Sequence, residues 1–243
     1  MKKIILSLCI LPLLATGAKA DPFAKFKTQI QALGSAQLKP FAADLGGIIG
    51  GNDFHSGAAI GFPGFDAGLS ATIQSKPSTE NRILRNAKVN SFGMPVLHAG
   101  AALPVIGADV MLRGISLSGF SIIGGGLRYP VLKSGTVTMF IPDVSVSAYY
   151  DVITYDYFKG THMSIDAAAS FNIPVIKPFA GVGIDRTKLE VKNVPGISAS
   201  GTISKTRYTV GVRFSPLPLL YVYGAYNMLH GQTGYSMGAG AKF

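Results

Sequence analysis

Hydrophobic and polar residues alternate along much of this chain, most clearly in its second half. One face of segment 162–172 would carry Met163, Ile165, Ala167, Ala169 and Phe171. Segment 203–214 repeats the pattern, with Lys205, Arg207 and Arg213 together on one face. A period of two is typical of a strand whose faces meet different surroundings. Three cations are hard to bury in a dry core, so that face is expected to meet water or opposite charges.

The first part of the expected mature chain, residues 21–54, has a helical pattern instead. Its apolar side chains recur at helical spacing as Phe23, Phe26, Ile30 and Leu33. This spacing predicts a short amphipathic helix ending near Gly34, and residues 37–49 form a second candidate helix interrupted by Pro40. Three placements are open: a periplasmic lead-in, a plug in the lumen of a barrel, or a position on a membrane surface.

Eleven segments are predicted to be strands: 57–62, 65–74, 94–103, 106–115, 119–129, 142–153, 162–172, 175–186, 203–214, 218–229 and 233–243. Single-chain bacterial outer-membrane barrels have even strand numbers. One segment is therefore missed, split or counted although it lies outside the sheet. The fold class predicted is all-β: an antiparallel transmembrane β-barrel of 10–12 strands with a short N-terminal helical segment.

The connections between these segments alternate in kind. Short ones containing Pro are 62–65, 103–106, 173–176 and 215–218, and longer or more polar ones are 75–91, 154–161, 187–201 and 230–233. Tight periplasmic turns and longer outer loops are typical of outer-membrane barrels. Counting back from a periplasmic C-terminus puts the Pro turns, and the longer connection 130–141, in the periplasm. Residues 41–56 must then cross the membrane, through the lumen or as a poorly patterned first strand.

Composition agrees with a barrel. Only 14% of the residues are charged, and the chain has 30 Gly and no Trp, whereas soluble domains average about 25% charged residues. An ordinary soluble β-sandwich or barrel is the alternative. The formal charge is +10, but the cations are scattered along strands and loops without an aromatic platform. We therefore expect a mildly cationic lumen or attraction to outer-membrane lipid headgroups, and no nucleic-acid partner.

The N-terminus is typical of an exported protein. Lys2 and Lys3 precede an apolar run, 4–14, which is too short to span a bilayer, and Ala18-Lys19-Ala20 supplies the small residues of a cleavage site. The lone Cys9 lies inside the run after Leu8, where lipidation would need a small residue. The domains predicted are a signal peptide (1–20), a helical lead-in or lumen plug (21–54) and an outer-membrane β-barrel (55–243). The mature chain would carry no thiol.

The polar faces of the predicted strands would bring many charges into the lumen. The residues expected to line it are Asp66, Asp109, Arg113, Arg128, Asp151, His162, Asp166, Lys177, Asp185, Lys205, Arg207, Arg213 and Lys242. Mixed charges in a narrow barrel either pair across the lumen and close it or line a pore that selects solutes. Both interpretations are open.

Catalytic signals are weak. His162 lies on a polar face and His98 has an unclear side, and a barrel hydrolase would need such a histidine beside a serine. Gly114-Ile115-Ser116-Leu117-Ser118 lacks the final glycine of the Gly-x-Ser-x-Gly elbow. No His, Asp or Glu residues have the sequence spacing of a metal site. The protein is expected not to be an enzyme and to need no metal or cofactor.

The C-terminal strand ends in an aromatic residue. Tyr235, Met237 and Phe243 share its apolar face, and an aromatic ring is favoured at a membrane–water interface. A terminal strand closed by Phe resembles the C-terminal signature of bacterial outer-membrane β-barrels. The resemblance implies that these three residues form an assembly signal for the barrel-assembly machinery.

Several tracts also resemble an uncharacterised family of bacterial outer-membrane β-barrels. They are Leu38-Lys39-Pro40-Phe41-Ala42-Ala43-Asp44-Leu45-Gly46, Asn52-Asp53-Phe54-His55-Ser56-Gly57, Ile141-Pro142-Asp143-Val144-Ser145 and Pro178-Phe179-Ala180-Gly181-Val182-Gly183. A looser similarity is to fatty-acid transport barrels, which place an N-terminal segment in the lumen. The function expected is passive passage or binding of a small solute, hydrophobic solutes included. A structural or surface-interaction barrel is the alternative, and an outer-membrane barrel hydrolase is the minor one.

Overall fold

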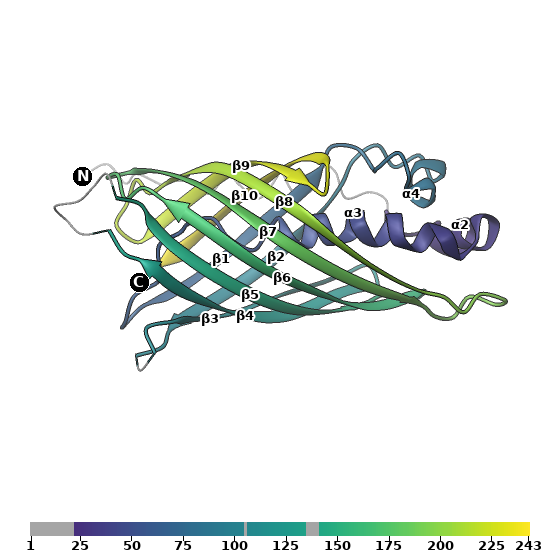
Figure 1. The fold of residues 1–243 in the computed structure, drawn as a ribbon, viewed down its shortest axis with the longest axis horizontal. Helices are drawn as coiled ribbons and strands as arrows, with labels where there is room; N and C mark the ends of the chain where they lie inside the picture. The colour runs from purple at the N-terminus through teal and green to yellow at the C-terminus, as the bar shows by residue number, and fades with distance from the viewer. Residues whose placement is uncertain (1–21, 105, 135–140) are drawn as a thin grey trace, which may run out of the picture.

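The computed structural model of the chain describes residues 22–104, 106–134 and 141–243. The predicted signal peptide and Cys9 lie outside these residues. In the described part, ten antiparallel strands form one closed barrel (Figure 1). The strands are β1 (Phe65–Gln74), β2 (Phe92–Ala102), β3 (Asp109–Leu117), β4 (Phe120–Leu132), β5 (Asp143–Thr154), β6 (Phe158–Ser170), β7 (Ile176–Val191), β8 (Ser200–Phe214), β9 (Leu220–Leu229) and β10 (Gln232–Lys242). The closing pair joins β1 to β10.

The predicted strand at 57–62 is wrong, and it explains the odd count. Residues 57–60 of this segment lie inside the barrel, and two of their backbone N–H groups donate to side chains of the wall. The backbone N–H of Gly57 donates to Ser170 Oγ at 3.0 Å, and that of Ile60 donates to Asp109 Oδ2 at 2.9 Å. These two N–H groups are therefore satisfied without a strand partner, as buried backbone requires. The other ten predicted segments overlap β1 to β10.

The helices lie before the barrel and in its first connection. They are α2 (Phe26–Leu33), the 3₁₀ turn η1 (Ser35–Gln37), α3 (Leu38–Gly50) and α4 (Arg82–Asn86). The helix predicted to end near Gly34 is confirmed, since Gly34 takes a φ of 82°. The predicted interruption at Pro40 does not occur, because Pro40 lies in the first turn of α3, where its missing N–H has no intrahelical partner to lose. No described helix is long and apolar enough to span a bilayer.

Helix α3 runs into the barrel, so residues 41–56 take the route through the lumen. From Asp44 to Gly50 every residue of the helix is buried. Helices α2 and α4 stand at the end of the barrel far from the C-terminus, beside the long β7–β8 hairpin (Figure 1). We call this the outer end, because outer-membrane barrels have long outer loops and a periplasmic C-terminus. The opposite, inner end holds Phe243.

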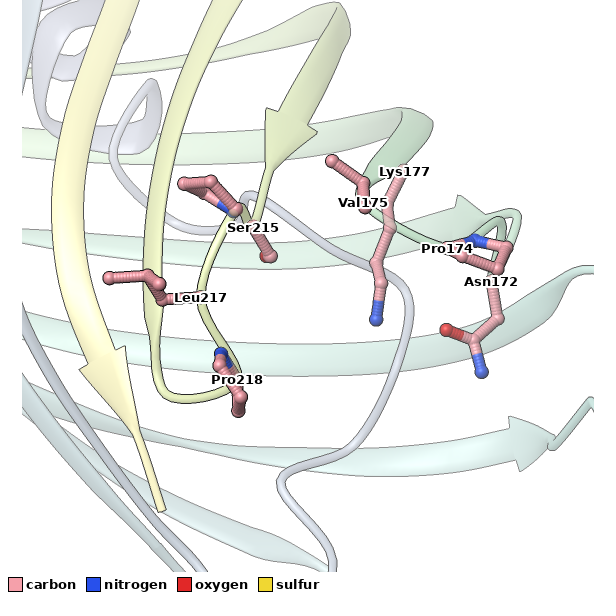
Figure 2. Close-up of a pocket in the computed structure, with 8 residues that line it drawn as sticks. Asn172, Pro174, Val175, Lys177, Ser215, Leu217 and Pro218 are labelled. Atoms are coloured by element: carbon pink, nitrogen blue, oxygen red, sulfur yellow. The ribbon is translucent and has the colours of Figure 1, made fainter.

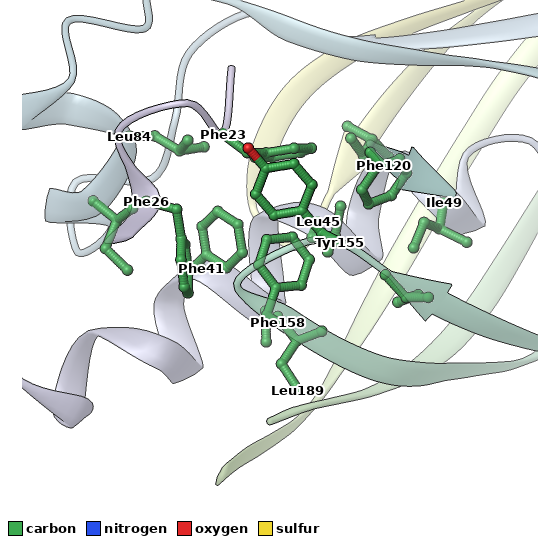
Figure 3. Close-up of a cluster of buried hydrophobic side chains, with 14 of the residues drawn as sticks. Phe23, Phe26, Phe41, Leu45, Ile49, Leu84, Phe120, Tyr155, Phe158 and Leu189 are labelled. Carbon is green, nitrogen blue, oxygen red and sulfur yellow. The ribbon is translucent and has the colours of Figure 1, made fainter. Parts of the chain in front are cut away.

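An aromatic cluster closes the outer end (Figure 3). Phe41 of α3 packs between α2 and β6, with ring centroids 4.9 Å from Phe26 and 5.3 Å from Phe158. Phe23 adds ring contacts to Phe120 at 5.3 Å and to Tyr155 at 5.7 Å. This cluster is the main apolar core of the chain, and it joins the helices to the strand ends.

The outside of the barrel is apolar over its middle. Ile165 and Ile123 are each 68% exposed, and Met163 and Tyr208 lie on the same outer surface. Arg213, on the opposite face of β8, is buried within the barrel. Apolar side chains therefore face outward and charges inward, the reverse of a soluble barrel and the arrangement that a bilayer requires.

Candidate functional site: a filled lumen with paired charges

The structure places most predicted lumen residues inside the barrel. Those exposed by less than a tenth are Asp66, Asp109, Arg113, Arg128, Asp151, His162, Asp166, Asp185, Arg207 and Arg213. Lys177 and Lys242 are partly exposed. Lys205 is exposed, because β8 pairs with β9 only from Arg207 onward and its earlier residues stand beyond that neighbour.

Asp53, just after α3, is the centre of the largest charge network. Arg207 Nη2 donates to Asp53 Oδ2 at 2.7 Å and to Asp166 Oδ1 at 2.7 Å. Arg113 contacts the other oxygen of Asp53 and binds Asp151 through two bonds, at 2.8 Å and 2.7 Å. Charge-assisted and bidentate bonds of this kind are among the strongest hydrogen bonds in proteins. We call residues 51–60, which follow α3 inside the barrel, the lumen segment. The bonds of Asp53 and of its two arginine partners join this segment to β3, β5, β6 and β8.

The network continues through β7 to the β9–β10 turn. Arg207 Nε donates to Asp185 Oδ2 at 3.2 Å, and His230 Nε2 lies 2.8 Å from the same oxygen. The other ring nitrogen of His230 lies 2.7 Å from the carbonyl oxygen of Ala43 in α3. The ring of His230 therefore joins Asp185 of β7 to the backbone of α3.

A second group of polar residues lies toward the inner end. The ring of His55 stacks between Tyr221 and Tyr223, with centroids 4.9 Å and 5.0 Å away. Asp66 accepts a bond from the Tyr221 hydroxyl at 2.8 Å and lies 3.3 Å from His98 Nε2. His55 thus packs the lumen segment against β9, and Asp66 links β1 to β2 and β9.

Asp44 attaches the outer half of α3 to the β1–β2 connection. Its carboxylate accepts bonds from Gln74 Nε2 at 3.0 Å, the Ser78 backbone N–H at 2.9 Å and Asn81 Nδ2 at 2.8 Å. Hydrogen bonds of Asp44 thus hold the outer half of α3, and ion pairs of Asp53 hold the residues after the helix. The aromatic cluster packs against α3 at the outer end through Phe41.

Glycines let α3 lie directly on the charged wall. A Cβ on Gly50 would come within 2.6 Å of Asp185 Oδ2 and 2.8 Å of Arg207 Nε. A Cβ on Gly183 of β7 would come within 2.6 Å of Arg207 Nη2. No side chain fits at either position without moving the ion pairs, so the glycines are part of how the lumen is filled.

One small cavity lies within the described lumen. A cavity of about 10 Å³ lies beside Asp53, Arg113 and Tyr149, no larger than one water molecule needs. A larger hollow of about 460 Å³ lies at the inner end between the β6–β7 and β8–β9 turns, lined by residues such as Lys177 and Leu217 (Figure 2). This hollow is open to solvent at the inner rim of the barrel.

The described histidines do not form a serine–histidine pair. His98 contacts Tyr221 and Asp66, His162 Nδ1 lies 2.9 Å from Thr187 Oγ1, and His230 contacts a carbonyl and a carboxylate. Thr187 is 1% exposed. Its hydroxyl therefore lies out of reach of a substrate in the described arrangement.

The outer end is strongly basic at its surface. Its exposed or partly exposed cations are Lys25, Lys27, Lys39, Lys76, Arg82, Arg85, Lys88, Lys159, Lys188 and Lys192, and the carboxylates are Glu80, Asp156 and Glu190. Glu190 is bound by Lys188 at 2.7 Å and by Lys159 at 3.4 Å, and the hydrogen bond from Lys188 lowers the pKa of this carboxyl group. Among the described residues, the ion pairs at this end are those of Glu190 with Lys188 and Lys159.

Sequence reasoning missed the residues of the lumen segment. Asp53 and His55 follow a helix in a polar tract, where side chains are usually solvated, and nothing in their spacing separates them from such residues. It also missed the meeting of Asp53, His162 and Asp185, whose ligand-type atoms lie within 4.8 Å of one another. These three come from distant segments, so no sequence spacing could have indicated the group.

Comparisons with known proteins match outer-membrane barrels. No protein-family model and no curated protein matches the chain. It is similar to Ail of Yersinia pestis (12% identity, TM-score 0.32, covering 74% of this chain and 97% of Ail) and to the N-terminal β-barrel domain of Pseudomonas aeruginosa OprF (14%, 0.34, 74% and 98%). It is also similar to the translocator domain of the autotransporter NalP from Neisseria meningitidis (12%, 0.40, 82% and 93%).

At such identities the likeness concerns the barrel fold alone, and these structures do not support the looser similarity to fatty-acid transport barrels. The closed sheet and its apolar outer surface define the class. The chain is a bacterial outer-membrane β-barrel protein, with its N-terminal segment inside the lumen.

Proposed function

We propose that this protein works as a closed outer-membrane barrel that binds an anionic partner at its outer end. The observation that carries the proposal is the filled lumen. Helix α3 and the segment after it occupy the barrel interior, and their polar groups are bound to the wall by buried ion pairs. Such a barrel conducts solutes poorly, so its accessible chemistry lies on its surface.

The surface of the outer end favours a polyanion. Ten exposed or partly exposed cations stand there against three carboxylates. A cation near an anionic surface contributes about 1 kcal/mol of attraction, and the effect is screened by salt. The partner class is a phosphate-, sulfate- or carboxylate-bearing polymer or headgroup layer at the cell surface. Outer-membrane lipid, with its phosphates, is one such partner.

The test compares cations at the two ends of the barrel. The variant Arg82→Glu/Arg85→Glu reverses two exposed charges of α4, and Lys133→Glu reverses one at the inner end. Purified protein in neutral detergent is applied to immobilised dextran sulfate, with neutral dextran as the blank. We expect wild type and Lys133→Glu to bind with steep salt dependence and the double variant to lose roughly tenfold in affinity. Equal binding to neutral dextran, or no loss in the double variant, would contradict the proposal.

Passive passage of a small solute is the second candidate, and the polar wall favours it. Ser70, Thr72, Thr209, Asn227 and Ser236 face the interior, so a barrel without its internal segment would contain water. Passage would then require the segment to move, and hydrophobic solutes of the fatty-acid kind belong to this candidate. Planar-bilayer conductance separates the two: steady, pore-sized conductance by wild-type protein would favour passage.

We also propose that the protein has no catalytic role. The proposal rests on the contacts of the described histidines, whose hydroxyl partners in that part of the chain are Tyr221 and the buried Thr187. A serine-directed probe that labels the intact barrel would overturn it. Assembly through the barrel-assembly machinery, with Tyr235, Met237 and Phe243 as its signal, is likewise proposed; all three residues are exposed on the outer surface.

A further inference from the structure

The charge network around Asp53 has more carboxylates than cations. Asp53, Asp151, Asp166 and Asp185 are all nearly inaccessible to solvent, and they share Arg113 and Arg207 as their guanidinium partners. Four carboxylates therefore share two guanidinium groups, and His230 beside Asp185 is a further nitrogen partner. Buried net charge is costly unless another cation balances it.

His162 lies beside this network and has an unpartnered ring nitrogen. The residue is fully buried, its Nδ1 lies 2.9 Å from Thr187 Oγ1, and its Nε2 has no hydrogen-bond partner in the described structure. When Nδ1 carries the proton and donates it to Thr187, the lone pair of Nε2 is free. A histidine whose other nitrogen is held in this way is the usual form of a metal ligand.

Two carboxylates lie close to the His162 ring. One ligand atom each from Asp53, His162 and Asp185 lies within 4.8 Å of the other two. Zinc binds imidazole nitrogen and carboxylate oxygen at roughly 2.0–2.2 Å, so its ligand atoms stand about 3.3 Å apart in a tetrahedral site. The three side chains therefore need only to close by about an ångström. Arg207 retains Asp166 when Asp53 turns toward the metal.

We propose that Asp53, His162 and Asp185 bind one divalent transition-metal cation of the zinc type. The cation adds positive charge to a network that has more carboxylates than guanidinium groups. It also links the lumen segment, through Asp53, to β6 and β7 of the wall. The site is a structural metal site that holds the lumen segment in the barrel. It is separate from the basic surface of the outer end.

The test measures zinc retention by the full-length barrel. Wild-type protein is refolded in detergent with Zn²⁺ or with a chelator, then passed through gel filtration with a weak chelator. Heat-modifiable gel mobility checks that each sample is folded. We expect about one Zn²⁺ per chain and a higher unfolding temperature in the zinc-refolded sample. His162→Gln and Asp185→Asn are expected to reduce retention at least tenfold, as loss of a ligand should.

The control is His55→Gln, which changes the buried histidine stacked between Tyr221 and Tyr223. It is expected to retain zinc like the wild type. If a ligand variant fails to fold, zinc X-ray absorption on the wild type decides, since the site requires one imidazole and otherwise oxygen ligands. No retention by the wild type, equal retention by His162→Gln, or loss in His55→Gln alone would each overturn the proposal.

Discussion

Asp53 Oδ2 and Arg207 Nη2 lie 2.7 Å apart although 154 residues separate them in the chain. Asp53 follows α3 inside the lumen, and Arg207 belongs to the wall strand β8. Arg207 is 1% exposed and contacts three carboxylates. This relationship fixes the internal segment to the barrel and makes Arg207 the residue on which closure depends most.

Arg207→Met should loosen the internal segment and destabilise the barrel. The change removes one cation from three buried carboxylates and leaves Asp166 without its ion-pair partner. Removing one partner of a buried ion pair costs roughly 3–5 kcal/mol. Urea unfolding followed by heat-modifiable mobility measures the loss, and single-channel recording should detect new conductance. The control Lys159→Met removes an exposed pair with Glu190 and should cost less than about 1 kcal/mol. Equal effects of the two changes would contradict this role.

Gly50→Ala should disturb closure in the same way from the helix side. The added Cβ would meet Asp185 and Arg207 at 2.6 Å and 2.8 Å, and overpacking of this kind costs about 1–3 kcal/mol. Gly224→Ala is the control, since a Cβ there has open space around it. Unfolding midpoints in urea should fall for Gly50→Ala and stay close to wild type for Gly224→Ala. A stable Gly50→Ala protein would show that α3 lies farther from the wall.

Phe158→Ala should release the helices at the outer end without opening the sheet. Phe158 is fully buried in the aromatic cluster, and truncating such a residue costs about 3–5 kcal/mol. Limited proteolysis should cut the variant in α2 while β-sheet circular dichroism is retained. Phe65→Ala, at the start of β1, changes a residue that is 61% exposed and should leave α2 protected. Identical protection in both variants would contradict the assigned packing.

Ile165→Arg should hinder insertion into lipid. Ile165 lies near the middle of β6 and is 68% exposed on the outer surface. Arginine at the bilayer midplane of a barrel costs about 2–4 kcal/mol, and the cost falls toward the interfaces. Leu117→Arg, at the outer end of β3, should therefore cost about 1 kcal/mol or less. Folding yields into phosphatidylcholine vesicles measure both, and equal yields would argue against a membrane-facing surface at Ile165.

Phe243→Ala should lower assembly in cells without changing the folded barrel. Phe243 pairs with Phe65 through backbone bonds of 2.8 Å and 3.1 Å, which alanine keeps, and its ring is 62% exposed. Vesicle folding of purified protein should therefore match wild type, while outer-membrane yield falls. Phe214→Ala, another exposed aromatic change at the inner rim, should leave yield in cells unchanged. A parallel loss in vesicles would indicate a structural role instead.

The alternation of polar and apolar residues predicted the strands well, because each strand separates two environments. Ile165 and Asp166 meet lipid and lumen for that reason, and their neighbours follow the same rule along β6. The segment 57–62 was misassigned because its short pattern fits either a strand or an extended chain. Lys205 lies on the lumen-facing side of β8, yet it is exposed because β9 pairs with β8 only from Arg207 onward. The alternation of residues along one strand does not predict where its neighbour ends.

The sequence by itself determined the fold class, the faces of the strands and the helical nature of the lead-in, since these depend on local spacing. Only the tertiary structure decided that α3 enters the lumen, that Asp53 meets Arg113 and Arg207, and that His162 faces Asp53 and Asp185. Those contacts join residues far apart in the chain. They depend on which residues of neighbouring strands pair and on the close approach at Gly50. The alternation of polar and apolar residues fits many such pairings, so it could not predict these contacts.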